Sequence, residues 1–383
     1  MFVLHVITAL NVGGAELMLK RLVESRWRDS NIRHVVISLM DVGPIGQQLQ
    51  AQNIEVHALG MHGFRDIPRI LFSLRRLIGT LRPDIVQTWM YHADLLGGLA
   101  ARWAGIRTVI WGIRQTDITK GGPRTTVWVR RVCAFLSYVV PHTIVCVAEA
   151  SKRVHIELGY CARRMRVVPN GFDFRRLQAS EAEVAALRIA CGWLNDEVVV
   201  GCVGGFHPFK GFDQFVHAAG KVARQFESVR FLMVGRGLRP DNVELTRWIA
   251  QTGFPERFVL LGERSDVPAC LAAMDVFCLS SRTEGFPNVV GEAMAMGLPC
   301  VVTDVGDAAM LLAGAGVVVP KEDAPALAQG MARLLRLSVE ERRTLGRAAR
   351  ARIKNEFSME QCTQRFEAVY ADVLMFQAWL QSK

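Results

Sequence analysis

Two glutamates, Glu284 and Glu292, bracket the segment EGFPNVVGE, which follows one apolar run and ends before Gly297 and Pro299. With Pro287 as the first helical residue, Glu284 would lie in the loop before a helix and Glu292 on its second turn. Backbone amides at such a helix start can hold a diphosphate, and the carboxylates can accept hydrogen bonds from sugar hydroxyls. An ordinary capped helix with two solvated glutamates is the alternative, and the strand–loop–helix setting favours the binding site.

A glycine-rich turn with one lysine follows a second apolar run, Val198–Val203. Gly204 and Gly205 would let the backbone approach a phosphate, and Lys210 would supply positive charge at the start of the next helix. Taken alone, the turn could equally be a simple connection with an exposed lysine.

A similar turn, which contains Gly13 and Gly14, follows the apolar start of the chain. Neither turn has the GxGxxG pattern of dinucleotide-binding proteins, and the chain contains no GxxxxGK[ST] motif. The sequence therefore gives little support to a dehydrogenase or a P-loop nucleotidase.

Short β-branched runs alternate with longer amphipathic stretches along the chain, and several of the short runs are apolar throughout. Strands covered by helices on both faces have this character, so the pattern predicts an α/β protein with two open parallel sheets. The predicted strands are Phe2–Thr8, His34–Leu39, Glu55–Leu59, Ile85–Thr88, Thr108–Ile113, Thr143–Val147 and Arg166–Val168 in the first half, and Val198–Val203, Arg230–Val234, Phe258–Leu261, Val276–Ser280, Pro299–Thr303 and Gly316–Val319 in the second.

The composition changes near residues 170–197, where a Pro-Asn-Gly turn is followed by a charged helical stretch and Gly192. We therefore predict a first domain over residues 1–175 and a second over residues 195–357. Two helical segments, roughly 338–354 and 358–381, end the chain. In a two-sheet design such a tail can cross back, so residues 358–383 are assigned to the first domain.

The excess positive charge is confined to one half of the chain. The net charge is +10, of which residues 1–180 carry +12 and residues 181–383 carry −2. A one-sided basic field indicates an anionic partner. No motif that reads nucleic acid is present, so we expect an anionic membrane surface or a phosphorylated lipid and no nucleic acid.

Half of the residues are hydrophobic, as in a folded globular protein, and the nine cysteines form no CxxC pair. This usage predicts reduced thiols in the cytoplasm and no metal cluster. The first ten residues predict a buried strand and not a signal peptide. The run Val132–Ala148 is too short and too interrupted for a membrane span.

The stretch 123–140 mixes cations with aromatic side chains, as helices at a membrane interface do. Packing of the same helix into the protein core is the alternative. The residues concerned are Arg124, Arg130, Arg131, Trp128, Phe135 and Tyr138.

Taken together, these motifs resemble the retaining glycosyltransferases of family four, and the resemblance runs along nearly the whole chain. It is carried by NVGGAE near the start, PNGFD at 169–173, the FHPFKG turn, LGERSDVP at 261–268 and SSRTEGFPNVVGEAM. The segments WMYHADLLGG at 89–98 and VIWGIRQTD at 109–117 are most similar to bacterial members that build O-antigen, capsule or exopolysaccharide.

The resemblance implies a GT-B fold, in which two Rossmann-like domains with parallel sheets face a central cleft. The second domain would bind the nucleotide sugar and the first the acceptor. Glu292 would hold the ribose, Glu284 would contact the donor sugar, and Lys210 would bind the diphosphate. The other implied donor-binding residues are Gly13, Gly14, Gly204, Gly205, Leu261, Arg264, Gly285, Phe286, Pro287 and Asn288.

Two positions depart from the family pattern. Gly205 stands where the family usually has an arginine that partners the lysine, and Arg282 or Arg264 would have to compensate. Where the family often has a histidine after the fifth strand, this chain has Arg114. His92, at a predicted helix start, is the second candidate beside the donor sugar, although a cap or packing role is equally open.

The chemistry implied by the resemblance needs no protein nucleophile, metal or other cofactor, because the leaving diphosphate takes the proton of the acceptor hydroxyl. We expect a UDP-sugar rather than a GDP-sugar as donor and a polyprenyl-diphosphate-linked saccharide as acceptor. The protein would be cytoplasmic and peripheral on the inner face of the bacterial membrane. A nucleotide-sugar epimerase of the same fold and a degenerate, non-catalytic sugar-binding relative are the alternatives.

Overall fold

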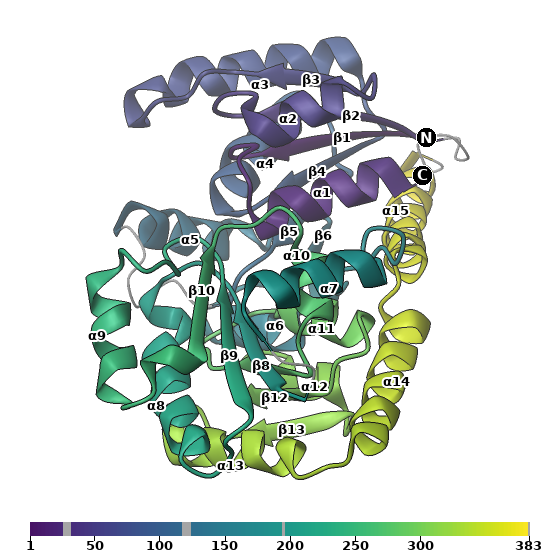
Figure 1. Cartoon of the computed structure of the whole chain (residues 1–383). Coiled ribbons are helices and arrows are strands. Elements are labelled where there is room, and N and C mark those ends of the chain that lie inside the picture. Colours follow the sequence, from purple (N-terminus) through teal and green to yellow (C-terminus); the bar gives the residue numbers. More distant parts are fainter. Residues whose placement is uncertain (26–31, 117–123, 194–195, 382–383) are drawn as a thin grey trace. The chain divides into compact units, whose positions relative to one another are not determined.

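The computed structural model describes residues 1–25, 32–116, 124–193 and 196–381 of the chain (Figure 1). These residues form two compact units. The first unit contains Met1–Gly171 together with Met359–Lys383, and the second contains Phe172–Ser358. The thirteen strands of the described ranges lie at the predicted places in the chain.

The first unit is built on a seven-stranded parallel sheet with the order β3-β2-β1-β4-β5-β6-β7. Its strands are β1 (Phe2–Ile7), β2 (Arg33–Ser38), β3 (Glu55–Ala58), β4 (Ile85–Trp89), β5 (Val109–Ile113), β6 (Thr143–Cys146) and β7 (Met165–Val167). Its helices are α1 (Gly14–Ser25), α2 (Gly43–Gln50), η1 (Phe64–Asp66), α3 (Ile67–Leu81), α4 (Tyr91–Trp103), α5 (Arg124–Leu136), α6 (Glu149–Glu157), η2 (Ala162–Arg164) and α15 (Met359–Gln381).

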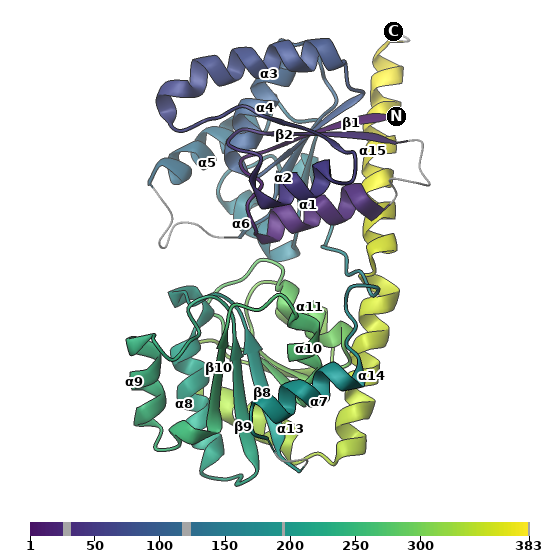
Figure 2. The same cartoon turned by 45° about the horizontal axis from the view of Figure 1, so that its top comes forward.

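Helices cover both faces of this first sheet. One hydrophobic core joins the sheet to α3, α4 and α5, and a second joins it to α1, α2 and α15 (Figure 2). Helix α4 lies very close to the sheet because it carries Gly97 and Gly98. A Cβ atom on Gly98 would come within 2.5 Å of the indole nitrogen of Trp111.

The C-terminal helix α15 is part of the first unit, as predicted for the end of the chain. Phe366 is fully buried, and its ring lies 6.1 Å from that of Trp89 at the end of β4. The hydroxyl of Tyr370 is hydrogen-bonded to Gln87, and the thiol of Cys362 donates to the carbonyl of Pro169. Residues 193 to 283 positions apart in the chain therefore share one core.

The second unit is built on a six-stranded parallel sheet with the order β10-β9-β8-β11-β12-β13. Its strands are β8 (Val198–Val203), β9 (Val229–Val234), β10 (Phe258–Gly262), β11 (Val276–Leu279), β12 (Cys300–Thr303) and β13 (Gly316–Val319). Its helices are α7 (Glu181–Ala190), η3 (Pro208–Lys210), α8 (Phe212–Ala223), α9 (Val243–Gln251), η4 (Pro255–Arg257), α10 (Val267–Ala272), α11 (Asn288–Ala295), α12 (Ala308–Leu312), α13 (Ala324–Leu335) and α14 (Val339–Glu356).

The boundaries of the two units differ from the predicted 175 and 195, because the linker region belongs to the second unit. Helix α7 lies in this region and contacts α10. Its Arg188 donates hydrogen bonds to the carbonyl oxygens of Ala273 and Glu197, at 2.9 and 2.7 Å. None of the helices in the described ranges combines the length and the apolar character needed to cross a lipid bilayer.

We expect Phe366→Ala to lower the unfolding free energy of the first unit by about 3–5 kcal/mol, because it leaves a cavity beneath β4. Urea denaturation followed by circular dichroism would measure the loss. Met375→Ala, in the same helix but 64% exposed, is the matched control and should change stability by less than about 0.5 kcal/mol. Equal losses in the two variants would contradict the packing of α15 described above.

Candidate functional site

The predicted residues of the second unit gather at the carboxyl edge of its sheet. β8 lies between β9 and β11, so the chain reverses its direction of winding at this point. Ligands of open α/β sheets bind outside the carboxyl ends of the strands at such a position. The loops that follow β8 and β11 carry Lys210 and Glu284, respectively.

Lys210 and Glu284 form an ion pair that joins these two loops. The ammonium nitrogen lies 2.7 Å from Oε1 of Glu284, and the side chains are 32% and 12% exposed. The hydroxyl of Ser281 donates to the same carboxylate oxygen at 2.7 Å, and that of Ser280 donates to the carbonyl of Lys210 at 2.9 Å. The structure therefore brings together two predicted site residues, and it adds Ser281, which the sequence analysis did not select.

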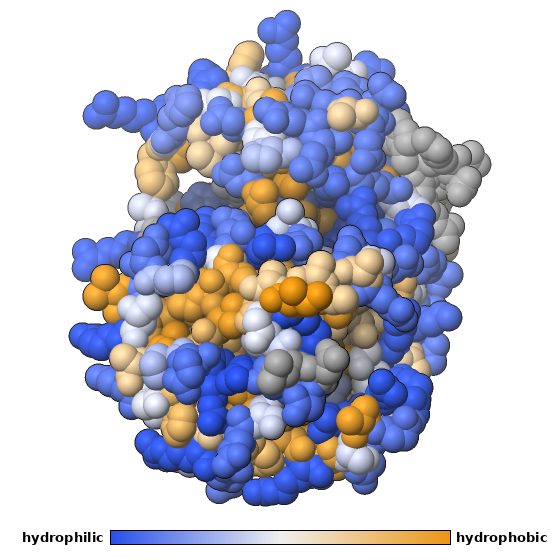
Figure 3. All heavy atoms as spheres, in the orientation of Figure 1, coloured by the Kyte–Doolittle hydropathy of each residue, from blue (hydrophilic) through white to orange (hydrophobic). Residues whose placement is uncertain are grey.

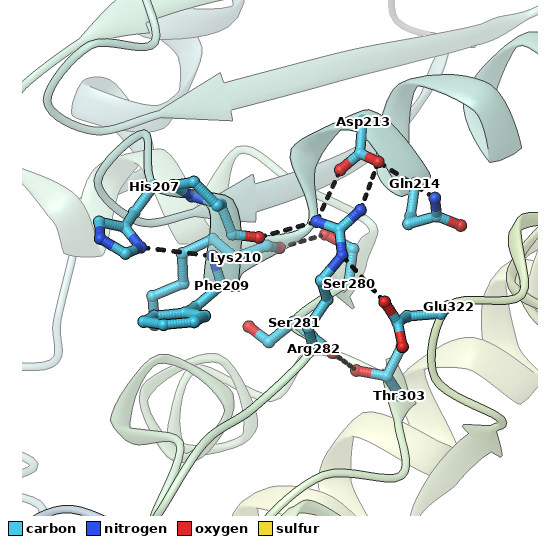
Figure 4. A network of polar contacts seen from close by, with 11 residues as sticks. His207, Phe209, Lys210, Asp213, Gln214, Ser280, Ser281, Arg282, Thr303 and Glu322 are labelled. Carbon is cyan, nitrogen blue, oxygen red and sulfur yellow. Dashed lines mark hydrogen bonds and ion pairs between the residues drawn. The ribbon is translucent and has the colours of Figure 1, made fainter. Parts of the chain in front are cut away.

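Arg282, the residue after Ser281, holds in place the loop between β8 and α8 that carries Lys210, the lysine loop (Figure 4). Its guanidinium donates to both carboxylate oxygens of Asp213, at 2.9 and 2.5 Å, and to the carbonyl of Pro208 at 2.7 Å. Its Nε lies 3.3 Å from Oε1 of Glu322. Burial is the largest single effect and raises the pKa of Asp213, but the hydrogen bonds from Arg282 and Gln214 and the charge of Arg282 together hold the pKa below its usual value.

Arg282 and Arg264 are thus both paired with acids. Nε and Nη2 of Arg264 donate to the carboxylate of Asp266 at 2.7 and 2.5 Å, just after the strand that contains Leu261. Hydrogen bonds from Arg264 lower the pKa of Asp266. Both arginines considered as replacements for the cation missing at Gly205 thus have an acidic partner, as Lys210 itself does, and a role for either of them at the diphosphate stays a prediction. A Cβ atom on Gly205 would meet nothing within 4 Å, so the turn has room for a side chain.

Two other glycines have conformations that the site requires. Gly211 follows Lys210 with φ of 61°, and a Cβ there would come within 2.2 Å of the carbonyl oxygen of Ser280. Gly306 has φ of 56°, and a Cβ there would come within 2.4 Å of the carbonyl oxygen of Gly285. A side chain at either position would separate the loops of the site.

Helix α11 starts one residue later than predicted. Pro287 is the N-cap and not the first helical residue, because its carbonyl accepts the first helical hydrogen bond from Val290 at 3.0 Å. Asn288 opens the helix and Glu292 lies on its second turn, both half-buried. The ring of Phe286 is buried against Phe172 and Phe357, so only its backbone can serve a ligand.

An aromatic pocket lies beside the lysine loop and was not predicted. Its volume is about 330 Å³, and Phe206, Phe209, Phe212 and Trp248 line it. The signal in the sequence that could have predicted this pocket is the spacing of three residues between Phe206, Phe209 and Phe212, on either side of Lys210. On the face drawn in Figure 3, hydrophobic side chains of this unit gather over α9, which carries Trp248, and over β10.

The predicted residues of the first unit lie at the carboxyl ends of its strands, in the loops or helix starts after β1, β4 and β5. Gly13 precedes α1, and Gly14 is its first residue. His92 lies in the first turn of α4, where burial lowers its pKa. Arg114 lies 5.1 Å over the ring of Trp89 and is hydrogen-bonded to Asn170.

The charge of Arg114 has no acidic partner among the described residues. Its Nε and Nη1 are buried and make no hydrogen bond there, and burial lowers the pKa of the guanidinium to about 10. Arg114 therefore remains charged at neutral pH. The carboxyl end of β5 consequently carries a cation, whereas the family pattern has a histidine.

In the described ranges, no group of three or more His, Cys, Asp or Glu residues is placed to hold a metal ion. The nine cysteines are free thiols, and burial raises the pKa of Cys146 to about 12. Buried thiols of this kind stay protonated and are poor nucleophiles. The candidate site of the second unit consists of Lys210, Glu284 and Glu292 with the backbone around them.

Two family models match this chain. Glycosyltransferase Family 4 matches residues 12–176, and Glycosyl transferases group 1 matches residues 197–337. The chain belongs to the glycosyltransferase family that these two models describe.

Several curated relatives of this chain are bacterial. The UDP-Gal:alpha-D-GlcNAc-diphosphoundecaprenol alpha-1,3-galactosyltransferase of Escherichia coli is 28% identical over 239 residues, or 61% of each chain. The lipopolysaccharide core biosynthesis mannosyltransferase LpsB of Rhizobium meliloti is 29% identical over 218 residues, which are 54% of this chain and 61% of LpsB. Putative glycosyltransferase EpsF of Bacillus subtilis is 26% identical and is matched over 94% of this chain and 91% of its own.

Solved structures confirm the GT-B fold of this chain. Anabaena HepE in complex with UDP-glucose matches with a TM-score of 0.83 at 23% identity, over 97% of this chain and 100% of its own. WaaG, a glycosyltransferase involved in lipopolysaccharide biosynthesis, matches with a TM-score of 0.71 at 14% identity, over 96% and 99%. Both similarities concern the fold.

We expect Arg282→Met to lower the unfolding free energy of the second unit by about 1.5–3 kcal/mol at pH 7, because it removes hydrogen bonds to charged groups. Arg239→Met is the matched control. It breaks an exposed pair with Asp241 and should cost less than about 1 kcal/mol. Urea denaturation of both variants measures the two effects.

The cost of Arg282→Met should also depend on pH. Since the pKa of Asp213 is lowered in the folded state, its contribution is present above the unfolded-state pKa of about 3.9 and is lost as the pH falls through the folded value. The difference between wild type and Arg282→Met should therefore shrink at about pH 3. A difference that is the same at both pH values would contradict this account.

Proposed function

We propose that this chain is a retaining glycosyltransferase that moves a sugar from a nucleotide-diphosphate sugar onto a lipid-linked saccharide in bacterial surface polysaccharide synthesis. The observation that carries the proposal is the Lys210–Glu284 pair at the switch point of the second sheet, beside the start of α11. The named activities of the E. coli and R. meliloti relatives support it.

The second unit binds the donor in this proposal. Glu292 accepts hydrogen bonds from the ribose, and the amides at the start of α11 face the diphosphate together with Lys210. When the donor binds, Lys210 exchanges its carboxylate partner for phosphate oxygens, and Glu284 becomes available to the sugar hydroxyls. We propose UDP as the nucleotide, in line with the UDP-glucose complex of HepE and the UDP-Gal named for the E. coli relative.

The reaction breaks the bond between the sugar C1 and the diphosphate oxygen and forms a bond from C1 to the acceptor oxygen on the same face. The proton of the acceptor hydroxyl passes to the leaving diphosphate, so no protein nucleophile, metal or other cofactor takes part. The protein must neutralise the charge that grows on the diphosphate, and Lys210 supplies that charge.

The first unit binds the acceptor in this proposal. A pocket of about 290 Å³ opens at the carboxyl edge of its sheet, between the ends of β1 and β2 and the starts of α4 and α5. Apolar side chains line most of it, and the hydroxyls of Thr125 and Thr126 and the ring of His92 supply polar contacts. This mixture suits a sugar attached to a lipid.

We propose that the protein works as a peripheral protein on the cytoplasmic face of an anionic membrane, where its lipid-linked acceptor would lie. The expected helix is α5, and five of the six side chains named for this stretch in the sequence are exposed. Arg130 is only 3% exposed, so the expectation that it faces the membrane is wrong. It lies on the helix face that packs against α4.

An exposed stripe on α5 supports the membrane proposal. It contains Arg124, Trp128, Arg131 and Phe135, at positions i, i+4, i+7 and i+11 of one helix face. Trp128 and Phe135 are 61% and 79% exposed. Cations beside exposed aromatic rings are typical of interfacial helices.

Nucleoside diphosphate should be released only when nucleotide sugar and a polyprenyl-diphosphate-linked saccharide are both present, and it should still be released in excess EDTA. Lys210→Ala should reduce kcat more than it raises KM for the donor, because charge builds up on the diphosphate in the transition state. A coupled assay for free nucleotide measures both. Conversion of the nucleotide sugar without acceptor would indicate an epimerase, and binding without turnover would indicate a non-catalytic relative.

Glu292→Ala should weaken binding of bare UDP by about 1.5–3 kcal/mol, because one charge-assisted contact to the ribose is lost. Calorimetric titration with UDP measures the change. Glu340→Ala is the control, since its side chain is 68% exposed at the start of α14. Unchanged affinity of Glu292→Ala for UDP would remove Glu292 from the donor site.

A further inference from the structure

Three arginines and a histidine surround a pocket at the amino edge of the first sheet, opposite the edge where the proposed acceptor pocket lies. Arg102, Arg107, Arg164 and His142 line it together with Phe376, and its volume is about 350 Å³. The arginines and the histidine lie in the segments that precede β5, β6 and β7, so the pocket opens at the amino ends of these strands. The proposed acceptor pocket lies at their carboxyl ends, so the two sites are separate.

The positive charge of this arginine pocket is not neutralised. None of the residues that line it is acidic, and neither Arg102 nor Arg107 makes an ion pair within the described ranges. Burial and the nearby charges of Arg107 and Arg164 lower the pKa of Arg102. Like charges at close range destabilise each other, so a bound anion would stabilise this arrangement.

The geometry of the pocket is held by neighbouring groups. Arg164 donates a hydrogen bond to the carbonyl of Pro141, and the ring of His142 lies 4.6 Å from that of Phe376. Burial and the charges of Arg164 and Arg166 lower the pKa of His142, so its ring is neutral at pH 7. The nearby carboxylate of Asp372 is taken by Arg166, at 2.7 Å.

Exposed hydrophobic side chains border the arginine pocket. Tyr138, Val139 and Phe376 are 55%, 60% and 43% exposed, and Phe135 lies one turn before Tyr138. A site for a small soluble anion gains nothing from apolar groups that stand in water. A membrane surface offers both a phosphate for the arginines and an apolar layer for the rings.

We propose that the arginine pocket binds the phosphate of an anionic phospholipid headgroup and docks the first unit on the membrane. This inference rests on the proposed function, to which it adds the docking site and its chemistry. Helix α5 connects the two sites, because Thr125, Thr126 and Trp128 line the acceptor pocket and Val139 and Val140, just beyond its end, line the arginine pocket. A membrane along the exposed stripe of α5 therefore meets both openings.

The test is the double variant Arg102→Gln/Arg107→Gln, which keeps the backbone hydrogen bond of Arg164. Each basic residue near an anionic surface contributes about 1 kcal/mol, so binding to vesicles of phosphatidylglycerol and phosphatidylcholine should weaken about 30-fold. Arg224→Gln/Arg343→Gln, two exposed arginines of the second unit, removes the same net charge and should bind like wild type. Co-sedimentation at low ionic strength measures the partition of all three proteins, and thermal unfolding followed by circular dichroism checks that both units of each variant are folded.

Each result decides one part of the inference. If wild type binds these vesicles and the Arg102→Gln/Arg107→Gln variant binds equally well, the arginine pocket is not the docking site, although membrane association stands. If wild type ignores anionic vesicles, membrane association itself fails. If inorganic phosphate binds the arginine pocket of wild type in a calorimetric titration, and vesicles of phosphatidylglycerol do not compete with it, the pocket serves a soluble phosphate and the lipid assignment is wrong.

Discussion

The ion pair between Lys210 and Glu284 joins two loops that are seventy-four residues apart in the chain, and much of the second unit serves to bring them together. The pair forms because β8 and β11 are neighbours in the sheet, so both loops leave the same edge. Gly211 permits the close approach of the lysine loop to Ser280, and Arg282 ties that loop to Asp213. An opposite charge thus already neutralises Lys210 where a diphosphate would bind.

The cations at the proposed sites of the two units differ in whether they have carboxylate partners. In the second unit the cations near the proposed donor site are matched by carboxylates, since Lys210, Arg264 and Arg282 each have an acidic partner. In the first unit Arg102 and Arg107, which line the arginine pocket, have no carboxylate partner among the described residues. An ordered donor site needs exact pairing, whereas attraction to an anionic surface needs unpaired charge.

The fold could be predicted from the sequence, because buried parallel strands are apolar runs and each run has its own turn residues. The pairing of Lys210 with Glu284 could be expected only in outline, since it requires the order of the strands. The prediction that was wrong depended on the direction in which a side chain points. Nothing local in the sequence shows that Arg130 points inward. The arginine pocket could not be predicted because its residues come from segments far apart in the chain, which include the end of α4, the segments before β5, β6 and β7, and α15.

The chain enters the second unit at Phe172 and leaves it at Ser358, and these two residues form a parallel bridge. The second unit is therefore an insertion whose ends meet, and its residues are contiguous. The first unit has the opposite property, because Phe366 and Tyr370 complete a core that begins at β1. A frameshift or premature stop after residue 358 would consequently damage the half of the protein that is made first, and leave the later half whole.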